Sequence, residues 1–190
     1  MKKIYVIRHG ETLFNRYHMM QGSCDSPLTK TGKKQALKAK EYFEKNNIVF
    51  DHAYTSTSER AIDTLEIITD VAYTRMKELK EMDFGRLEGQ RDIMCPNDKS
   101  KFDTFFVEYG GESVYDMLKR VKSGFDKIFK SDYEKILVVT HGAVMMNLYR
   151  HIVDKNYKFD KALGNCSIFE FDYDQKFEFK NWIDHDFSDI

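Results

Sequence analysis

Two short runs of β-branched and apolar residues, far apart in the chain, both end in the dipeptide His-Gly. The run from Lys3 to Ile7 leads into Arg8-His9-Gly10, and the run from Ile136 to Thr140 leads into His141-Gly142. Continuous apolar runs of this length are typical of parallel strands buried on both faces. We therefore expect two buried strands of one parallel sheet, each followed by a histidine.

Segments of helical period lie between and after these two strands. Apolar residues recur at helical spacing in residues 31–45, 58–69 and 114–128, and Ser113 with Asp116 can cap the third of these helices. Residues 143–153 are apolar on most sides, as expected of a helix packed against a sheet. Residues 52–55 are predicted to form a further short strand. Strands that alternate with helices indicate an α/β fold.

The last part of the chain has a different period. Residues 166–173 and 177–182 alternate between apolar and polar with period two, around a turn near Asp174-Gln175. This pattern predicts an antiparallel hairpin or meander at one edge of the sheet.

Residues 90–111 form an insertion, in which Cys95-Pro96-Asn97-Asp98 is followed by Phe102, Phe105, Phe106 and Tyr109 at helical spacing. Two interpretations are open: a helix docked on the core, or a lid-like segment that covers the mouth of a pocket.

Composition excludes several classes of protein. Thirty Lys and Arg residues against 31 Asp and Glu leave a formal net charge of −1, which argues against a nucleic-acid partner. No apolar run is long enough for a signal peptide or a membrane span, so no membrane partner is expected. Cys24, Cys95 and Cys166 are far apart and lack the spacing of a disulfide framework or a zinc site. We expect a cytoplasmic protein with reduced thiols.

The two His-Gly dipeptides indicate an anion site. In open α/β sheets ligands bind outside the carboxyl ends of the strands, where His9 and His141 are expected to meet. Glycine after each histidine permits a close backbone approach to an anion, and the guanidinium groups of Arg8 and Arg60 match phosphate geometry. Taken singly, each arginine could equally form a surface salt bridge, and each histidine could be structural.

Further motifs follow in one order along the chain. They are Arg8-His9-Gly10-Glu11-Thr12, Asn15, Gln21-Gly22, Asp25-Ser26-Pro27-Leu28-Thr29, Gly32, Ser56-x-x-x-Arg60-Ala61-x-x-Thr64, Leu79-x-Glu81-x-x-x-Gly85, Gly110-Gly111-Glu112-Ser113 and Thr140-His141-Gly142. With these motifs the chain resembles the histidine phosphatase superfamily, in its phosphoglycerate-mutase-like branch, from about Lys3 to Ile168. The resemblance implies a three-layer αβα sandwich with a mostly parallel central sheet, antiparallel edge strands and a small helical insertion over the active site. We expect residues 1–190 to form one domain of this kind.

The resemblance also implies a role for each matching residue. His9 would be the nucleophile that attacks phosphorus in line and becomes phosphohistidine. The phosphoryl oxygens would be bound by Arg8, Asn15, Arg60 and His141. Attack requires an unprotonated ring nitrogen, which the neighbouring arginines favour, and a backbone carbonyl at Gly10 could hold the proton of the other nitrogen.

The proton for the leaving group is assigned by the same resemblance to Glu81, which could afterwards activate water. Asp83 and Glu88 are alternative candidates for this acid. A further interpretation is that Glu81 is only a carboxylate on a solvated helix face, as most single glutamates are. Gln21 and Gly22 are expected to bind substrate, and residues 21–25 and 90–111 to recognise the leaving group.

These assignments predict a metal-independent phosphatase that hydrolyses small phosphomonoesters through a phosphohistidine and needs no cofactor. The chain is shorter than the cofactor-dependent mutases, which favours a phosphatase over a phosphoglycerate mutase. A catalytically silent phospholigand-binding protein is the third alternative. The expected partner is a small phosphorylated metabolite, and a homodimer through the aromatic hairpin stays open.

Overall fold

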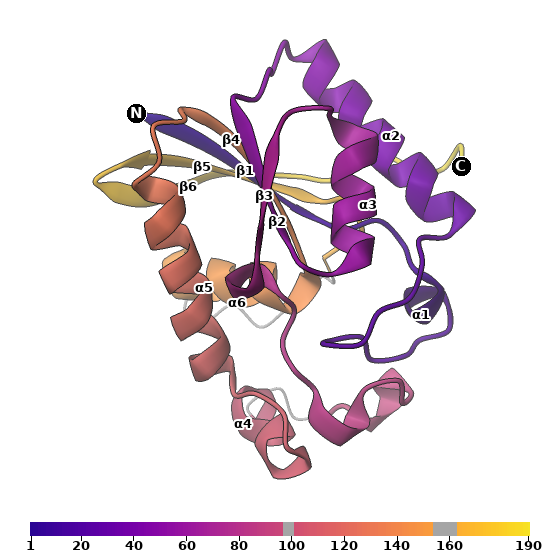
Figure 1. Ribbon diagram of the computed structural model, residues 1–190. Helices are drawn as coiled ribbons and strands as arrows, with labels where there is room; N and C mark the ends of the chain where they lie inside the picture. Colours follow the sequence, from indigo (N-terminus) through magenta and orange to yellow (C-terminus); the bar gives the residue numbers. More distant parts are fainter. Residues whose placement is uncertain (97–100, 154–162) are drawn as a thin grey trace.

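A six-stranded sheet forms the centre of the computed structural model, which describes residues 1–96, 101–153 and 163–190 (Figure 1). The strands are β1 (Lys2–Arg8), β2 (His52–Ser56), β3 (Tyr73–Met76), β4 (Lys135–Thr140), β5 (Ile168–Asp174) and β6 (Lys176–Ile183). Their order across the sheet is β3-β2-β4-β1-β5-β6. The two strands that are each followed by a histidine, β1 and β4, therefore lie side by side, with Arg8 opposite Thr140.

Strand direction divides the sheet into two parts. The four strands β3, β2, β4 and β1 are parallel, whereas β5 is antiparallel to β1 and β6 is antiparallel to β5. The turn between β5 and β6 places Gln175 at φ 62°. This confirms the expectation of a mostly parallel sheet with an antiparallel hairpin at one edge.

Helices cover both faces of the sheet and connect its strands. They are α1 (Leu13–Arg16), α2 (Lys30–Lys45), α3 (Glu59–Ile68), α4 (Phe102–Phe105), α5 (Val114–Phe129) and α6 (Gly142–Ile152). Short 3-10 helices cover Lys77–Leu79, Gly85–Leu87, Asp92–Met94 and Phe106–Tyr109. Helices α2 and α3 lie on one side of the sheet and α5 on the other, so the three-layer α/β arrangement is confirmed (Figure 1).

Alternation along β1 explains how each layer acquires its own core. Tyr5 and Ile7 face α2 and α3, where they join Phe43 and Leu65. Ile4 and Val6 face the opposite layer, where the apolar stripe of α5 and the first turns of α6 pack. Burial of the stripe follows from its period of three to four residues, and the predicted cap forms because the side chain of Ser113 accepts from the backbone N–H of Asp116.

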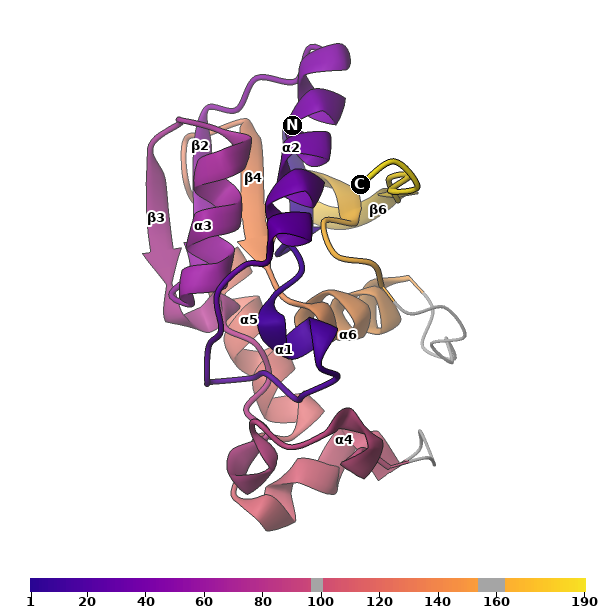
Figure 2. The ribbon, with the colours of Figure 1, turned by 90° about the vertical axis from the view of Figure 1, so that its right-hand side faces the viewer.

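The insertion differs from the single helix that its aromatic spacing suggests. Residues 97–100 lie outside the described residues; beyond them, α4 makes one turn and continues as a 3-10 helix that ends at Tyr109 and is followed by Gly110, with φ 78°. Phe106 is fully buried, so this part of the insertion is docked on the core. In Figure 2 it lies beyond the end of the sheet toward which β3 and β4 point. A lid movement stays a prediction.

The residues that the structure describes contain no helix with both the length and the apolar character that spanning a membrane requires.

Candidate active site

Two imidazole rings meet at the carboxyl ends of β1 and β4. The rings of His9 and His141 have centroids 5.2 Å apart and an interplanar angle of 62°. Both side chains are buried, with 3% and 0% of their surface exposed. The predicted juxtaposition arises because β1 and β4 are parallel neighbours in register, so residues that follow them emerge at the same edge.

His9 is held in one tautomer. Its Nδ1 lies 2.8 Å from the carbonyl oxygen of Gly10, as the sequence suggested, and its Nε2 accepts from Nε of Arg60 at 3.3 Å. The proton therefore resides on Nδ1 and the lone pair on Nε2. Burial, and then the charges of Arg60 and Arg8, hold the pKa of His9 well below its ordinary value, so the ring is a neutral nucleophile.

Gly10 is required by the packing of this turn. A Cβ atom at Gly10 would lie 2.5 Å from the carbonyl oxygen of Gly32, closer than nonbonded atoms approach. The N–H of Gly10 donates to the hydroxyl of Thr64 on α3 at 3.0 Å. The turn that orients His9 is thus clamped between α2 and α3.

Arg60 is fully buried and uses all five of its N–H groups within the protein. Nε donates to His9, and Nη1 donates to the carboxylate of Asp25 at 2.8 Å. The remaining three donate to the backbone carbonyls of Cys24 at 3.0 Å, Gly22 at 3.1 Å and Gln21 at 3.4 Å. The Arg60 charge therefore lies beside the nucleophile. A phosphoryl oxygen could accept from the Nε–H of Arg60 only by replacing His9 Nε2 as its acceptor.

Two buried polar atoms beside His9 lack a hydrogen-bond partner among the described residues: Nε of Arg8 and Nδ1 of His141. Arg8 donates from Nη1 to the carbonyl of Leu163. His141 Nε2 lies 2.7 Å from the hydroxyl of Ser56, which also accepts from the N–H of Ser58. We assign the hydroxyl proton to the bond with Nε2, because the described residues offer it no other acceptor, and this assignment leaves the ring's own proton on Nδ1. Two N–H donors are thus buried without an acceptor, which is costly unless an anion accepts from them.

The pKa of His141 is also well below its ordinary value, because the ring is buried and lies near Arg60. His141 is therefore a neutral hydrogen-bond donor in the folded protein and adds no positive charge to that of the arginines.

Asn15 lines the same cavity from α1. Its Oδ1 accepts from the backbone N–H of Thr12 at 3.2 Å and from Nδ2 of Asn165 at 3.2 Å. Because both bonds use the oxygen, the amide NH₂ is the end of Asn15 that remains for an anion. Asn165 also donates to the carbonyl of His9 at 3.0 Å, a contact across 156 residues that the sequence did not reveal.

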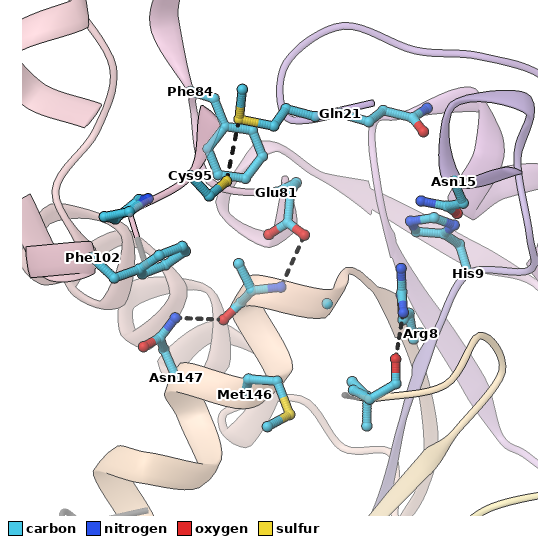
Figure 3. Close-up of a pocket in the computed structure, with 15 residues that line it drawn as sticks. Arg8, His9, Asn15, Gln21, Glu81, Phe84, Cys95, Phe102, Met146 and Asn147 are labelled. Atoms are coloured by element: carbon cyan, nitrogen blue, oxygen red, sulfur yellow. Dashed lines mark hydrogen bonds between the residues drawn. The ribbon is translucent and has the colours of Figure 1, made fainter. Parts of the chain in front are cut away.

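Glu81 lies between the two ends of the cavity (Figure 3). Its carboxylate accepts from the backbone N–H groups of Ala143 at 2.9 Å, Val144 at 3.2 Å and Met82 at 2.9 Å. The first two belong to the N-terminus of α6, which favours a carboxylate there. Glu81 is therefore fixed on the same helix that begins after His141.

Arg120 on α5 holds the backbone that carries Glu81. Its guanidinium donates to the carbonyls of Glu78 at 3.0 Å, Lys80 at 2.7 Å and Glu81 at 2.8 Å, and forms two bonds of 2.7 Å with the carboxylate of Glu112. Arg120 was not among the sequence candidates, because nothing in its helical neighbours distinguishes it from a surface arginine.

The alternatives to Glu81 have other partners. Asp83 accepts from the N–H of Gly85 at 2.8 Å, and Glu88 accepts from the N–H of Ser23 at 2.6 Å and from that of Cys24. Neither lines the cavity that contains His9, among the residues the structure describes. Glu81 is thus the carboxylate that shares a cavity with His9.

Gln21 and Gly22 occupy different positions at the site. Gln21 lines the cavity, accepts from the hydroxyl of Thr12 at 2.6 Å and donates to Asp25 at 3.3 Å. Gly22 offers its carbonyl to Arg60, and a Cβ there would lie 2.2 Å from the carbonyl oxygen of Met82. Both residues therefore help to form the loop that surrounds Arg60.

The cavity has a volume of about 480 Å³. Arg8, His9 and Asn15 lie at one end, and Phe84, Cys95, Phe102 and Met146 lie at the other (Figure 3). Within residues 1–96, 101–153 and 163–190, no three His, Cys, Asp or Glu side chains are grouped so that they could hold a metal ion.

Known proteins are similar to this chain in sequence and in fold. The chain is 31% identical over 156 residues to a protein of Bacillus subtilis named uncharacterized phosphatase PhoE, covering 80% of this chain and 78% of that one. It is 28% identical to phosphoglycerate mutase-like protein 4 of Arabidopsis thaliana, covering 96% and 85% of the two chains. The crystal structure of a phosphoserine phosphatase from Entamoeba histolytica, in complex with 3-phosphoglyceric acid, superposes with a TM-score of 0.80 at 25% identity, covering 97% and 98%.

The family model for branch 1 of the histidine phosphatase superfamily matches residues 4–185, from the first central strand to the C-terminal segment. Since this match spans both histidine turns, Arg60 and Glu81, the chain belongs to the histidine phosphatase superfamily, branch 1.

Proposed function

We propose that this protein hydrolyses small phosphomonoesters by way of a phosphohistidine at His9, without a metal ion. The observation that carries the proposal is the protonation state of His9. Its Nδ1–H donates to the carbonyl oxygen of Gly10, and burial together with two arginines keeps Nε2 unprotonated. The unpaired N–H groups of Arg8 and His141 and the amide of Asn15 supply donors for phosphoryl oxygens.

The reaction proceeds in two displacements at phosphorus. Nε2 of His9 forms a bond to phosphorus as the bond to the ester oxygen breaks, and Glu81, which enters this step as the protonated acid, gives its proton to that oxygen. Water then attacks the phosphohistidine while the Glu81 carboxylate takes up one of its protons. The N–P bond breaks, inorganic phosphate leaves, and His9 and Glu81 return to their first states.

A cytoplasmic small phosphorylated metabolite as substrate belongs to the same proposal. Cys24, Cys95 and Cys166 are free thiols, which is in keeping with a reducing compartment.

The test is phosphate release in EDTA from a panel of phosphomonoesters by wild type, His9→Ala and the control His151→Ala. His151 is an exposed residue near the end of α6, so its loss should leave turnover unchanged. We expect release by wild type and the control but not by His9→Ala. Equal release by His9→Ala would refute the mechanism.

Two other outcomes would select the alternatives. Interconversion of phosphoglycerates without net phosphate release would identify a mutase, which returns the phosphoryl group to product and shields it from water. Binding of orthovanadate with neither reaction would identify a silent phospholigand-binding protein.

A further inference from the structure

The end of the cavity away from His9 is apolar. Met20, Phe84, Phe102 and Met146 form its walls, and Cys95 lies beside Met20, with Sγ 3.5 Å from its Sδ. Figure 3 shows Phe84 and Phe102 on the far side of Glu81 from His9 and Arg8, with Met146 below Glu81 in this view. A phosphomonoester bound with phosphorus at His9 therefore directs its leaving group past Glu81 into these walls.

The walls are preformed by packing behind them. Phe106 is fully buried, and its ring centroid lies 4.7 Å from that of Phe84 and 5.3 Å from that of Phe102. The rings of Phe84 and Phe102, which face the cavity, are thus held in place by the fully buried ring of Phe106. A ligand need not order this surface on binding, which favours affinity for an apolar group.

Among the described residues, no charged side chain lines this end of the cavity. Among the described residues that line the cavity, the charged side chains are Arg8 and Glu81, both at the reacting centre. Asn147 adds an amide, whose Nδ2 donates to the carbonyl of Ala143 at 2.9 Å and whose Oδ1 accepts from Arg150 at 3.1 Å. Arg150 directs both terminal nitrogens to the carboxylate of Asp103, at 2.9 and 3.2 Å.

We propose that the substrate of this site carries an uncharged leaving group with an apolar body, such as an aryl or arylalkyl alcohol, in place of one that bears a carboxylate. This inference rests on the proposed function. A leaving group with a carboxylate would lose its hydration against two phenyl rings and two thioethers without gaining a partner charge from the described walls, which is strongly unfavourable. An arylalkyl group would exchange water for apolar contacts over its whole length.

The first test compares 2-phenylethyl phosphate with O-phospho-L-serine. Both are primary alkyl esters, so the same kind of bond breaks and the comparison reports on the leaving-group pocket. We expect kcat/KM to be at least about 100-fold higher for 2-phenylethyl phosphate, since an apolar pocket already discriminates by about that factor against an added hydroxyl group. Equal values, or a preference for phosphoserine, would overturn the inference and leave the proposed function intact.

A binding measurement keeps the two proposals separable. Titration calorimetry on His9→Ala protein reports affinity for the same two intact esters without turnover. Tighter binding of 2-phenylethyl phosphate supports the inference even if wild type releases no phosphate, a result that would overturn only the proposed function. Equal or weaker binding overturns the inference.

A charge placed in the wall should weaken the preference for 2-phenylethyl phosphate. Met146 lies on α6 and faces the cavity, so Met146→Lys offers a cation to a carboxylate there. We expect the ratio of kcat/KM for 2-phenylethyl phosphate to that for phosphoserine to fall at least about tenfold. His151→Lys adds the same charge to the same helix at an exposed position and should leave the ratio unchanged. A ratio unmoved in folded Met146→Lys, or moved equally by His151→Lys, would contradict the assignment of the wall.

Discussion

The ion pair between Arg60 and Asp25 offers a test of how the nucleophile is positioned. Arg60 is fully buried, whereas the side chain of Asp25 is 28% exposed. Asp25 accepts from Arg60 Nη1 at 2.8 Å and from the N–H of Glu59 at 2.6 Å. In Asp25→Asn, either Arg60 Nη1 or the N–H of Glu59 faces an amide NH₂ in place of an oxygen, and the Arg60 guanidinium loses the negative charge of Asp25.

The size of the effect follows from these contacts. Removing one partner of a fully buried pair costs about 3–5 kcal/mol, and partial access of water to residue 25 reduces the expected loss to about 2–3 kcal/mol. For a chain of this size, each kcal/mol lowers Tm by roughly 2–4 °C, so we expect a Tm lower by roughly 4–12 °C. Because Arg60 Nε contacts His9, kcat should fall on the order of 10- to 100-fold through misplacement of reacting groups.

Asp63→Asn is the matched control. Asp63 lies one turn after Arg60 on α3, and burial followed by the charges of Glu59 and Glu66 raises the pKa of Asp63. A raised pKa means that the ionised form is disfavoured by folding, so loss of this charge at pH 7 should leave stability unchanged or increase it. Urea unfolding and steady-state kinetics on both variants decide the matter. If Asp25→Asn were as stable and as active as Asp63→Asn, Arg60 would not depend on Asp25.

Three further outcomes are expected. The pKa values of His9 and His141 lie well below 6.5, so between pH 6.5 and 5.5 the unfolded chain binds protons that the folded chain does not bind. As the pH falls, the unfolding free energy should therefore decrease by up to about 1.4 kcal/mol per pH unit for each ring. An unchanged urea midpoint would contradict this. Glu81→Gln should slow 2-phenylethyl phosphate by about 10²–10⁴-fold and p-nitrophenyl phosphate far less, since nitrophenolate leaves without a proton; equal losses would point to another acid. Burial, with the carboxylate of Glu88, raises the pKa of the Cys24 thiol to about 11, so iodoacetamide at pH 8 should alkylate it about two orders of magnitude more slowly than a free thiol, and rapid labelling would refute this.

The central strands and the long helices were predictable because local pattern and burial coincide there. Both faces of β1 and β4 are covered, so their residues form continuous apolar runs, and α5 carries its stripe and its Ser113 cap in the sequence itself. Strand β3 was missed because it lies at the edge: of Tyr73–Met76 only Met76 is buried, so no alternation marks it. Helix α1 was missed because four residues are too few to show a period.

The site was predictable where chemistry follows a strand end. His9 and His141 meet because their strands are parallel neighbours. Partners that come from distant segments were not assigned a role: Ser56 and Asp25 belong to recognised motifs, but their contacts with His141 and Arg60 cross 85 and 35 residues. Asn165 showed no signal at all, because its contacts depend on where the chain returns to β1.

Trapping of the phosphoenzyme tests whether His9 is the nucleophile. Wild-type protein is mixed with substrate, quenched in base, in which phosphohistidine survives, and digested for peptide mass spectrometry. We expect one phosphoryl group on the peptide that contains His9, and none in His9→Ala. Phosphate release without any phosphoenzyme, or a phosphoryl group on another residue, would contradict this expectation.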